Sequence, residues 1–139
     1  MPTKWGLTPI FRLSLNCPTH PMPAYMLLIL EPHGQRAART EDEGRALYQR
    51  MLDFSETLKA RGVLRASQSL KTDTEGVRVA VRHGKRTLVD GPFSESKEMI
   101  GGYFLLDGVT KEEAVAIAAE VPAARWATVE VREFGPCFM

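Results

Sequence analysis

The sequence predicts an α+β protein with the ferredoxin-like plait, in which two helices cross over one antiparallel sheet. The expected elements follow one another as strand, helix, strands, helix, strand, which is the order of that plait. Two capping boxes, each followed by apolar residues at helical spacing, mark the two helices. The 139 residues, of which 44% are hydrophobic and 25% charged, fit one globular domain.

The first strand and the first helix are the clearest elements. Residues 24–30 form a short, unbroken apolar run that ends at a loop rich in Pro and Gly, which predicts a buried strand. Thr40 and Glu43 have the spacing of a capping box, and a helix is predicted over residues 41–61, before Gly62. Its buried face is expected to comprise Leu47, Met51, Phe54 and Leu58.

Several strands are predicted in the middle of the chain. Residues 63–70 form the first, and a polar turn follows. Residues 77–82 place valine at every second position, the period of a half-buried strand. His83-Gly84 makes a tight turn into a strand over residues 85–89. After an irregular loop, residues 101–106 form another strand that is nearly all apolar.

A second helix and a last strand complete the predicted plait. Thr110 and Glu113 repeat the capping box, and Pro122 ends the helix. The buried stripe of this helix is expected to comprise Ala114, Ile117, Ala118 and Val121. The last strand covers residues 128–133, where valines alternate with polar residues.

The predicted domain covers residues 24–134. Residues 1–23 are interpreted as a poorly structured N-terminal extension, with Met22 or Met26 as the natural beginning, and residues 135–139 as a C-terminal tail. No apolar run approaches the ~20 residues that a membrane span needs. The two cysteines form no CxxC motif, so a reducing cytoplasm is expected, although a bridge between the termini stays open.

The charge balance argues against two classes of partner. The formal net charge is +1, from 18 basic and 17 acidic residues. Such a chain creates no strong field toward nucleic acid or a membrane surface. We therefore expect neither partner.

A homodimer is expected from the strands that do not alternate. Two helices cover only one face of a sheet, and the other face should then be polar. Residues 26–30 and 103–106 are instead apolar on both sides. Each such side chain left in water forfeits roughly 1.5–3 kcal/mol of burial. A second copy of the chain is the economical cover, and the N-terminal extension is the alternative.

Residues 89–104, with the sequence VDGPFSESKEMIGGYF, closely resemble the signature of DGPF-type proteins in the YCII-related family. Residues 25–29 and 129–132 resemble the first and last strands of that family. The likeness extends from about residue 25 to residue 133. It implies a ferredoxin-like protomer in a dimeric α/β barrel.

The resemblance implies two kinds of activity. The wider family includes enzymes that act on small aromatic or dienone-like compounds, with a histidine near the first helix and an aspartate further on as acid–base pair. The predicted first helix here contains no histidine, so that pair is not carried over whole. DGPF-type members are also considered companions of extracytoplasmic-function sigma factors.

Asp90 is the leading candidate for proton transfer, because it lies at a strand end where it can face a cleft made with the dimer partner. The structural interpretation of Asp90-Gly91-Pro92-Phe93 is a turn in which Phe93 anchors the loop. Lys97 can bind an anionic substrate, or form a solvated pair with its neighbour Glu98.

Four further residues are candidates for substrate binding. His33 lies where the first strand ends, a position that either borders a cleft or belongs to an exposed loop. Glu130 and Arg132 point to the same side of the last strand, where they bind a polar ligand or take part in a cross-strand or intersubunit ion pair. Tyr103 lines the same space or belongs to the core. The three histidines are scattered, so neither a metal site nor a cofactor is predicted.

Two functional hypotheses follow from the sequence. The first is a homodimeric protein that binds a small molecule in a cavity near the dimer interface, with metal-free, lyase-like acid–base catalysis. The alternative is a non-catalytic accessory module in sigma-factor regulation. An enclosed pocket of roughly 300 Å3 or more, with Asp90 and a second titratable group pointing inward, favours the first, and an interior filled by side chains favours the second.

Overall fold

The computed structural model describes residues 23–138. The extension predicted for residues 1–23 lies outside these residues except for its last one. In chain order the elements are β1 (Ala24–Pro32), α2 (Glu41–Ala60), β2 (Leu64–Ser69), the 3-10 helix η2 (Asp73–Glu75), β3 (Val77–Arg82), β4 (Lys85–Asp90), β5 (Glu98–Asp107), α3 (Lys111–Glu120), the 3-10 helix η3 (Pro122–Arg125) and β6 (Thr128–Glu133). The predicted helices and strands are all present, with bounds that differ by a few residues.

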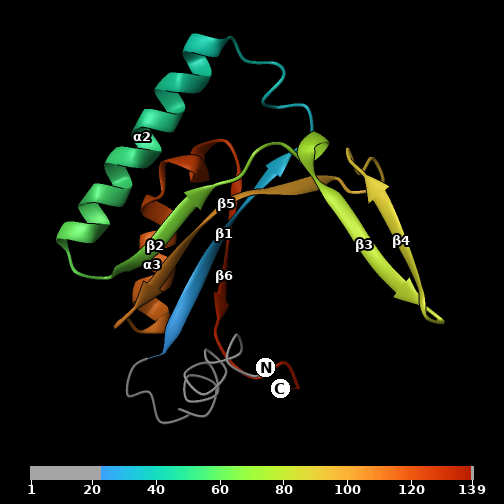
Figure 1. Ribbon diagram of the computed structural model, residues 1–139. Helices are drawn as coiled ribbons and strands as arrows, with labels where there is room; N and C mark the ends of the chain where they lie inside the picture. Colours follow the sequence, from blue (N-terminus) through green and yellow to red (C-terminus); the bar gives the residue numbers. More distant parts are fainter. Residues whose placement is uncertain (1–22, 139) are drawn as a thin grey trace, which may run out of the picture.

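The body of the molecule is a four-stranded antiparallel sheet in the order β2-β5-β1-β6. The helices α2 and α3 connect its strands and cover one face of the sheet (Figure 1). The first strand in the chain therefore lies beside the last one and beside β5, the third strand of the sheet in chain order. This arrangement confirms the ferredoxin-like prediction.

The core lies between the sheet and the two helices. Tyr25, Leu27 and Ile29 alternate along β1 toward the helices and are buried, as are Phe104 and Leu106 on β5. The predicted stripe of α3 is confirmed, since Ala114, Ile117, Ala118 and Val121 are all buried. Along the predicted face of α2 only Leu58 is fully buried, and Leu47, Met51 and Phe54 are half-buried.

Both helices begin at the predicted capping boxes. In α2 the Thr40 hydroxyl accepts from the Glu43 N–H at 3.1 Å, and the Glu43 carboxylate accepts from the Thr40 N–H at 2.8 Å. Thr110 and Glu113 make the same pair of bonds at the start of α3. These reciprocal bonds satisfy backbone donors that the first turn of a helix leaves unpaired.

The sheet surface away from the helices is here called the open face. Cross-strand pairing joins Met26 to Leu105, Leu28 to Tyr103 and Leu30 to Ile100 on this side. These apolar side chains are half-buried, except Ile100, which is exposed. The sequence-based expectation of strands that are apolar on both sides is therefore confirmed for β1 and β5.

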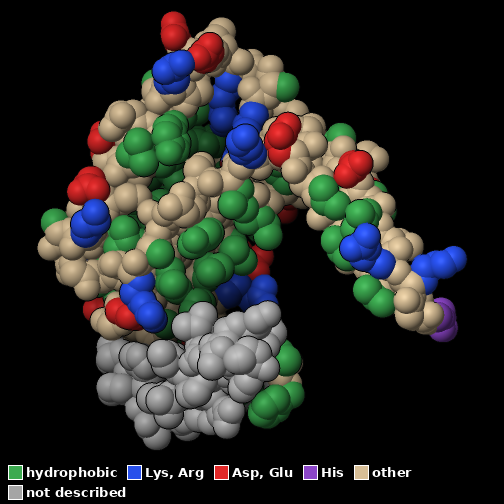
Figure 2. Space-filling view, in the orientation of Figure 1, with side chains coloured by type: hydrophobic (Ala, Val, Ile, Leu, Met, Phe, Trp, Pro, Cys, Tyr) green, Lys and Arg blue, Asp and Glu red, His purple; other side chains and the backbone are tan. Residues whose placement is uncertain are grey.

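Strands β3 and β4 form a separate two-stranded sheet, here called the hairpin arm (residues 77–90). The arm projects from the body and stands clear of it over much of its length (Figures 1 and 2). The predicted half-burial of its valines is wrong, because Val77, Val79 and Val81 are 54–61% exposed. Alternation alone does not tell whether an apolar strand face meets the chain's own core.

Candidate functional site

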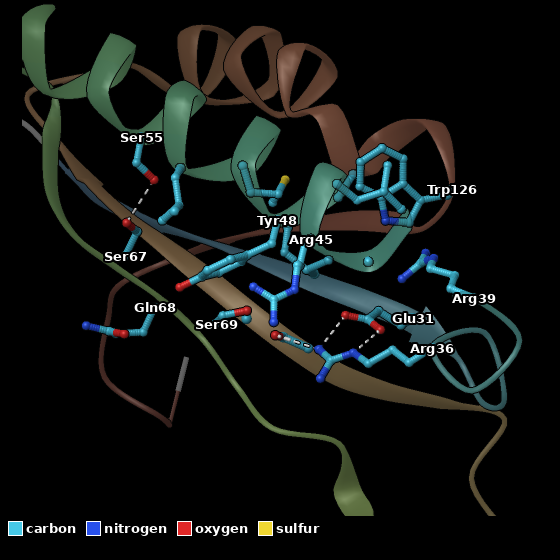
Figure 3. A pocket seen from close by; sticks show the side chains of 18 of the residues that line it. Glu31, Arg36, Arg39, Arg45, Tyr48, Ser55, Ser67, Gln68, Ser69 and Trp126 are labelled. Atoms are coloured by element: carbon cyan, nitrogen blue, oxygen red, sulfur yellow. Dashed lines mark hydrogen bonds and ion pairs between the residues drawn. The ribbon is translucent and has the colours of Figure 1, made fainter. Parts of the chain in front are cut away.

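A cleft with a volume of about 770 Å3 opens between α2 and the strands β1, β2 and β5 (Figure 3). Small residues of the sheet lie across the cleft from the helix, namely Ser67, Ser69, Gly101 and Gly102. Such residues fill little volume, so the helix packs closely only in its second half, where Leu58 is fully buried. The cleft is therefore a space that the local sequence leaves open.

Part of the cleft wall is apolar. It is lined by Ile29, Met51, Leu52, Phe104 and Trp126, which come from β1, α2, β5 and the residue after η3. Phe54 on α2 meets the Phe104 ring edge to face, with 5.8 Å between the ring centroids. The Ser55 and Ser67 hydroxyls are hydrogen-bonded at 3.1 Å across the cleft from helix to sheet. This wall suits a partly apolar ligand.

An ion pair with a buried carboxylate lies at one end of the cleft. Glu31 is only 7% exposed, and its two carboxylate oxygens accept from Nε and Nη2 of Arg36 at 2.9 and 2.8 Å. Arg36 also donates to the carbonyl oxygens of Leu70 at 2.7 Å and Gly101 at 3.1 Å. A Cβ on Gly101 would overlap the Glu31 carboxylate, so any other residue here would displace the ion pair. The pair fastens the loop after β1 to the sheet.

Arginine and aromatic side chains surround the mouth of the cleft. Arg45 and Tyr48 extend from α2 toward the strand side (Figure 3). The Arg45 Nε donates to Glu41 at 3.1 Å, and this pair is exposed. Arg39 lies over the Trp126 ring, 5.9 Å from its centroid. The mouth therefore combines positive charge with hydrogen-bond donors and an aromatic face.

Most residues predicted for the site lie away from this cleft. Asp90 is exposed at the end of β4, and Lys97 is exposed in the loop before β5. Glu130 and Arg132 bind each other on the open face, with 3.0 Å between Oε2 and Nη1. Tyr103 belongs to the strand segment that borders the cleft, but its pairing with Leu28 puts its side chain on the open face.

The structure brings together one pair of residues that the sequence did not connect. The Nε2 atom of His33 lies 3.5 Å from the Asp73 carboxylate, which also accepts from the Phe93 N–H at 3.3 Å. The peptide between Gly91 and Pro92 is cis, and a Cβ on Gly91 would overlap the Asp73 carbonyl oxygen. His33 and the motif of residues 90–93 thus meet at the base of the hairpin arm.

Phe93 anchors that base. Its side chain is buried, and the guanidinium of Arg78 from β3 stacks on its ring, 3.8 Å from the centroid. The Met99 sulfur of β5 lies 3.4 Å from the Asp73 N–H. These contacts agree with the structural interpretation of the motif as a turn anchored by Phe93.

Sequence reasoning missed the residues that shape the cleft. Glu31 carried a usable signal, because it continues the buried alternation of Tyr25, Leu27 and Ile29 with a charge. A carboxylate on a buried face predicts a cationic partner. Nothing local distinguished Arg36 from its neighbour Arg39, or marked Trp126 as part of the site. Those residues meet the cleft only through the fold.

The described residues hold neither a cluster of metal-ligating side chains nor a helix that could span a membrane. No group of three or more His, Cys, Asp or Glu side chains is arranged to hold a metal ion in residues 23–138. Within the same range, neither helix has the length and hydropathy that crossing a membrane demands.

Comparison with known proteins identifies one family. Residues 25–136 match the model of the YCII-related domain. No curated protein matches the chain. The matched residues include every helix and strand described above apart from the first residue of β1.

Proposed function

This chain belongs to the YCII-related family, and we propose that its cleft between α2 and the sheet binds a small aromatic anion. The observation that carries this proposal is the combination of an apolar wall with an arginine-lined mouth in a space of about 770 Å3. Pockets for small molecules have this size and pair apolar lining with a few polar groups that orient the ligand. Arg39 and Arg45 supply the charge that favours an anion.

The proposal is limited to binding. Asp90 and Lys97 are not among the residues that line the cleft, and neither are His33 and Asp73. A proton-transfer group must lie within hydrogen-bond reach of the atom it serves. The lyase-like chemistry predicted from the sequence therefore has no support from the geometry of this cleft.

A titration with 2-naphthoate, followed by NMR amide shifts, tests the cleft. Arg45→Glu reverses a charge at the mouth, whereas Lys59→Glu makes the same change on α2 outside the cleft. We expect shifts in residues 44–55, 67–69 and 101–104, and a Kd raised roughly tenfold by Arg45→Glu only, since one charge-assisted contact is worth about 1.5 kcal/mol. Equal effects of the two variants, or shifts elsewhere on the sheet, contradict the proposal.

We also propose that the chain forms a homodimer through the open face. Met26, Leu28, Leu30 and Leu105 are apolar residues on the side of the sheet that no helix of the described chain covers. A two-fold axis would bury this face of each copy against the other copy and remove both surfaces from water at once. Sedimentation equilibrium is expected to give the dimer mass at micromolar concentration, and a monomer mass at every concentration contradicts this.

A further inference from the structure

The hairpin arm has one markedly apolar face. The antiparallel register pairs Val79 with Leu88, and Val77 and Val81 lie on the same side of the two strands, with the charged residues Asp90 and Arg86 at the two ends of this face. All four side chains are more than half exposed. The opposite side carries Arg78, Ala80, Thr87 and Val89. An isolated two-stranded hairpin is at best marginally stable in water, so a face of this kind calls for a covering surface.

The arm is held at its base in a way that keeps it away from its own body. Arg78 is stacked on buried Phe93, and the Gly91 N–H donates to the Gly76 carbonyl oxygen at 2.9 Å. Gly91 is packed against the backbone of Asp73. These contacts come from both ends of the hairpin and from the loop before it. They fix its direction, and Figure 2 shows open space beside the arm.

The chain itself offers a complementary surface on its open face. Leu28, Leu30 and Leu105 are half-buried and Ile100 is exposed there. The tip of the arm carries Arg82, Lys85 and Arg86, none of which forms an ion pair with another described residue. The open face carries the carboxylate of Glu98 and that of Glu130, which is bonded to Arg132 on the same face. The two regions thus match in apolar surface, and Glu98 offers the basic tip an anionic partner.

We propose that the apolar face of the hairpin arm of one copy packs on the open face of a second copy. The arm of the second copy packs in the same way on the open face of the first. The inference rests on the proposed homodimer and specifies how the copies hold each other. Because the arm and the open face belong to the same chain, a two-fold axis forms both arm-to-face contacts at the same time. The arms then clasp the dimer from its two sides, and their basic tips lie toward the partner's carboxylates.

Two lysine substitutions on the arm of the full chain test this clasp. Val79→Lys puts a charge on the apolar face, and Thr87→Lys puts the same charge on the opposite face of the hairpin. Both positions are exposed in one copy, so both variants are expected to fold, as circular dichroism can check. In sedimentation equilibrium we expect Val79→Lys to raise the dimer Kd by roughly tenfold or more and Thr87→Lys to leave it nearly unchanged.

A photo-crosslink identifies the surface that the arm touches. A benzophenone amino acid at Val81 is expected to give a covalent dimer whose bridge maps to residues 26–30 or 98–105 of the other copy. The same probe at Thr87 serves as control and is expected to give little product. A bridge from position 81 to residues 77–90 of the other copy overturns the inference, because the arms would then pair with each other.

The outcomes separate this inference from the proposed homodimer. If the wild-type chain dimerises and Val79→Lys leaves the dimer Kd unchanged, the proposed contact of the arm is wrong, but the proposed homodimer stands. A wild-type chain that sediments as a monomer at every concentration removes both.

Discussion

Glu31 and Arg36 show how one charged pair organises its surroundings. The carboxylate lies almost wholly out of water, and a buried charge is tolerated only when it is paired and hydrogen-bonded. Arg36 meets that condition with two bonds to Glu31 and two more to backbone oxygens. The pair therefore joins β1, the following loop, the residue after β2 and β5 at the end of the cleft.

Replacing Arg36 by methionine is expected to lower the free energy of unfolding by about 3 kcal/mol, because Glu31 would be left as an unpaired buried charge. The matched change Arg45→Met breaks the exposed pair with Glu41 and is expected to cost under about 0.5 kcal/mol. Urea denaturation at neutral pH measures both. Similar losses in the two variants would show that burial of Glu31 is not what makes its partner important.

Tyr25 is a second residue whose burial has a measurable consequence. Burial raises the pKa of its phenol above the ordinary value of 10.0, and the nearby carboxylates of Glu133 and Glu112 raise the pKa further. The folded chain then keeps a proton that the unfolded chain has already lost above about pH 10. Stability is accordingly unaffected by this group below that pH and falls as the pH rises through and beyond it.

The variant Tyr25→Phe is expected to remove this alkaline loss of stability. Denaturation midpoints measured from neutral pH to above about pH 10 should decline less steeply in the variant than in the wild type. The two chains should show parallel pH dependence below that range. An unchanged slope in the variant would mean that other groups dominate alkaline unfolding.

At the scale of elements, the hairpin arm and the sheet obey different constraints. The sheet strands β1 and β5 are held by the core on one side, whereas β3 and β4 pair only with each other. The arm depends on its base, where Phe93 is buried beneath Arg78. Local openings in proteins occur where few buried apolar contacts hold a segment.

Removing the Phe93 side chain should therefore increase local opening of the hairpin arm more than that of the four-stranded sheet. Phe93→Ala is expected to speed amide hydrogen exchange in residues 77–90 by roughly tenfold or more, with residues 102–106 little changed. Phe134→Ala removes a phenyl ring at an exposed position and serves as control. Loss of protection spread evenly over both sheets would contradict a local role for Phe93.

At the scale of the whole molecule, two surfaces of the chain remain apolar. The open face and one side of the hairpin arm both present aliphatic side chains. Large exposed apolar surfaces on a folded chain commonly mark an interface. The proposed homodimer with clasping arms covers both, and it leaves the cleft under α2 on the other side of the sheet, available to a ligand.

What the sequence by itself determined are the elements and their order. Capping boxes, helical spacing and unbroken apolar runs are local patterns, and they predicted both helices, the strands and the plait to within a few residues. The same patterns showed that β1 and β5 are apolar on both sides, and the motif at residues 90–93 indicated an anchored turn.

Only the tertiary structure decided where the site lies and what the arm exposes. The cleft joins Glu31, Arg36, Arg45 and Trp126, which are far apart in the chain and carry no common local pattern. Likewise the valines of β3 alternate as they would in a covered strand, but the pairing of β3 with β4 alone leaves them in water. Local patterns follow from interactions between near neighbours, whereas a site depends on which distant segments the packing brings together.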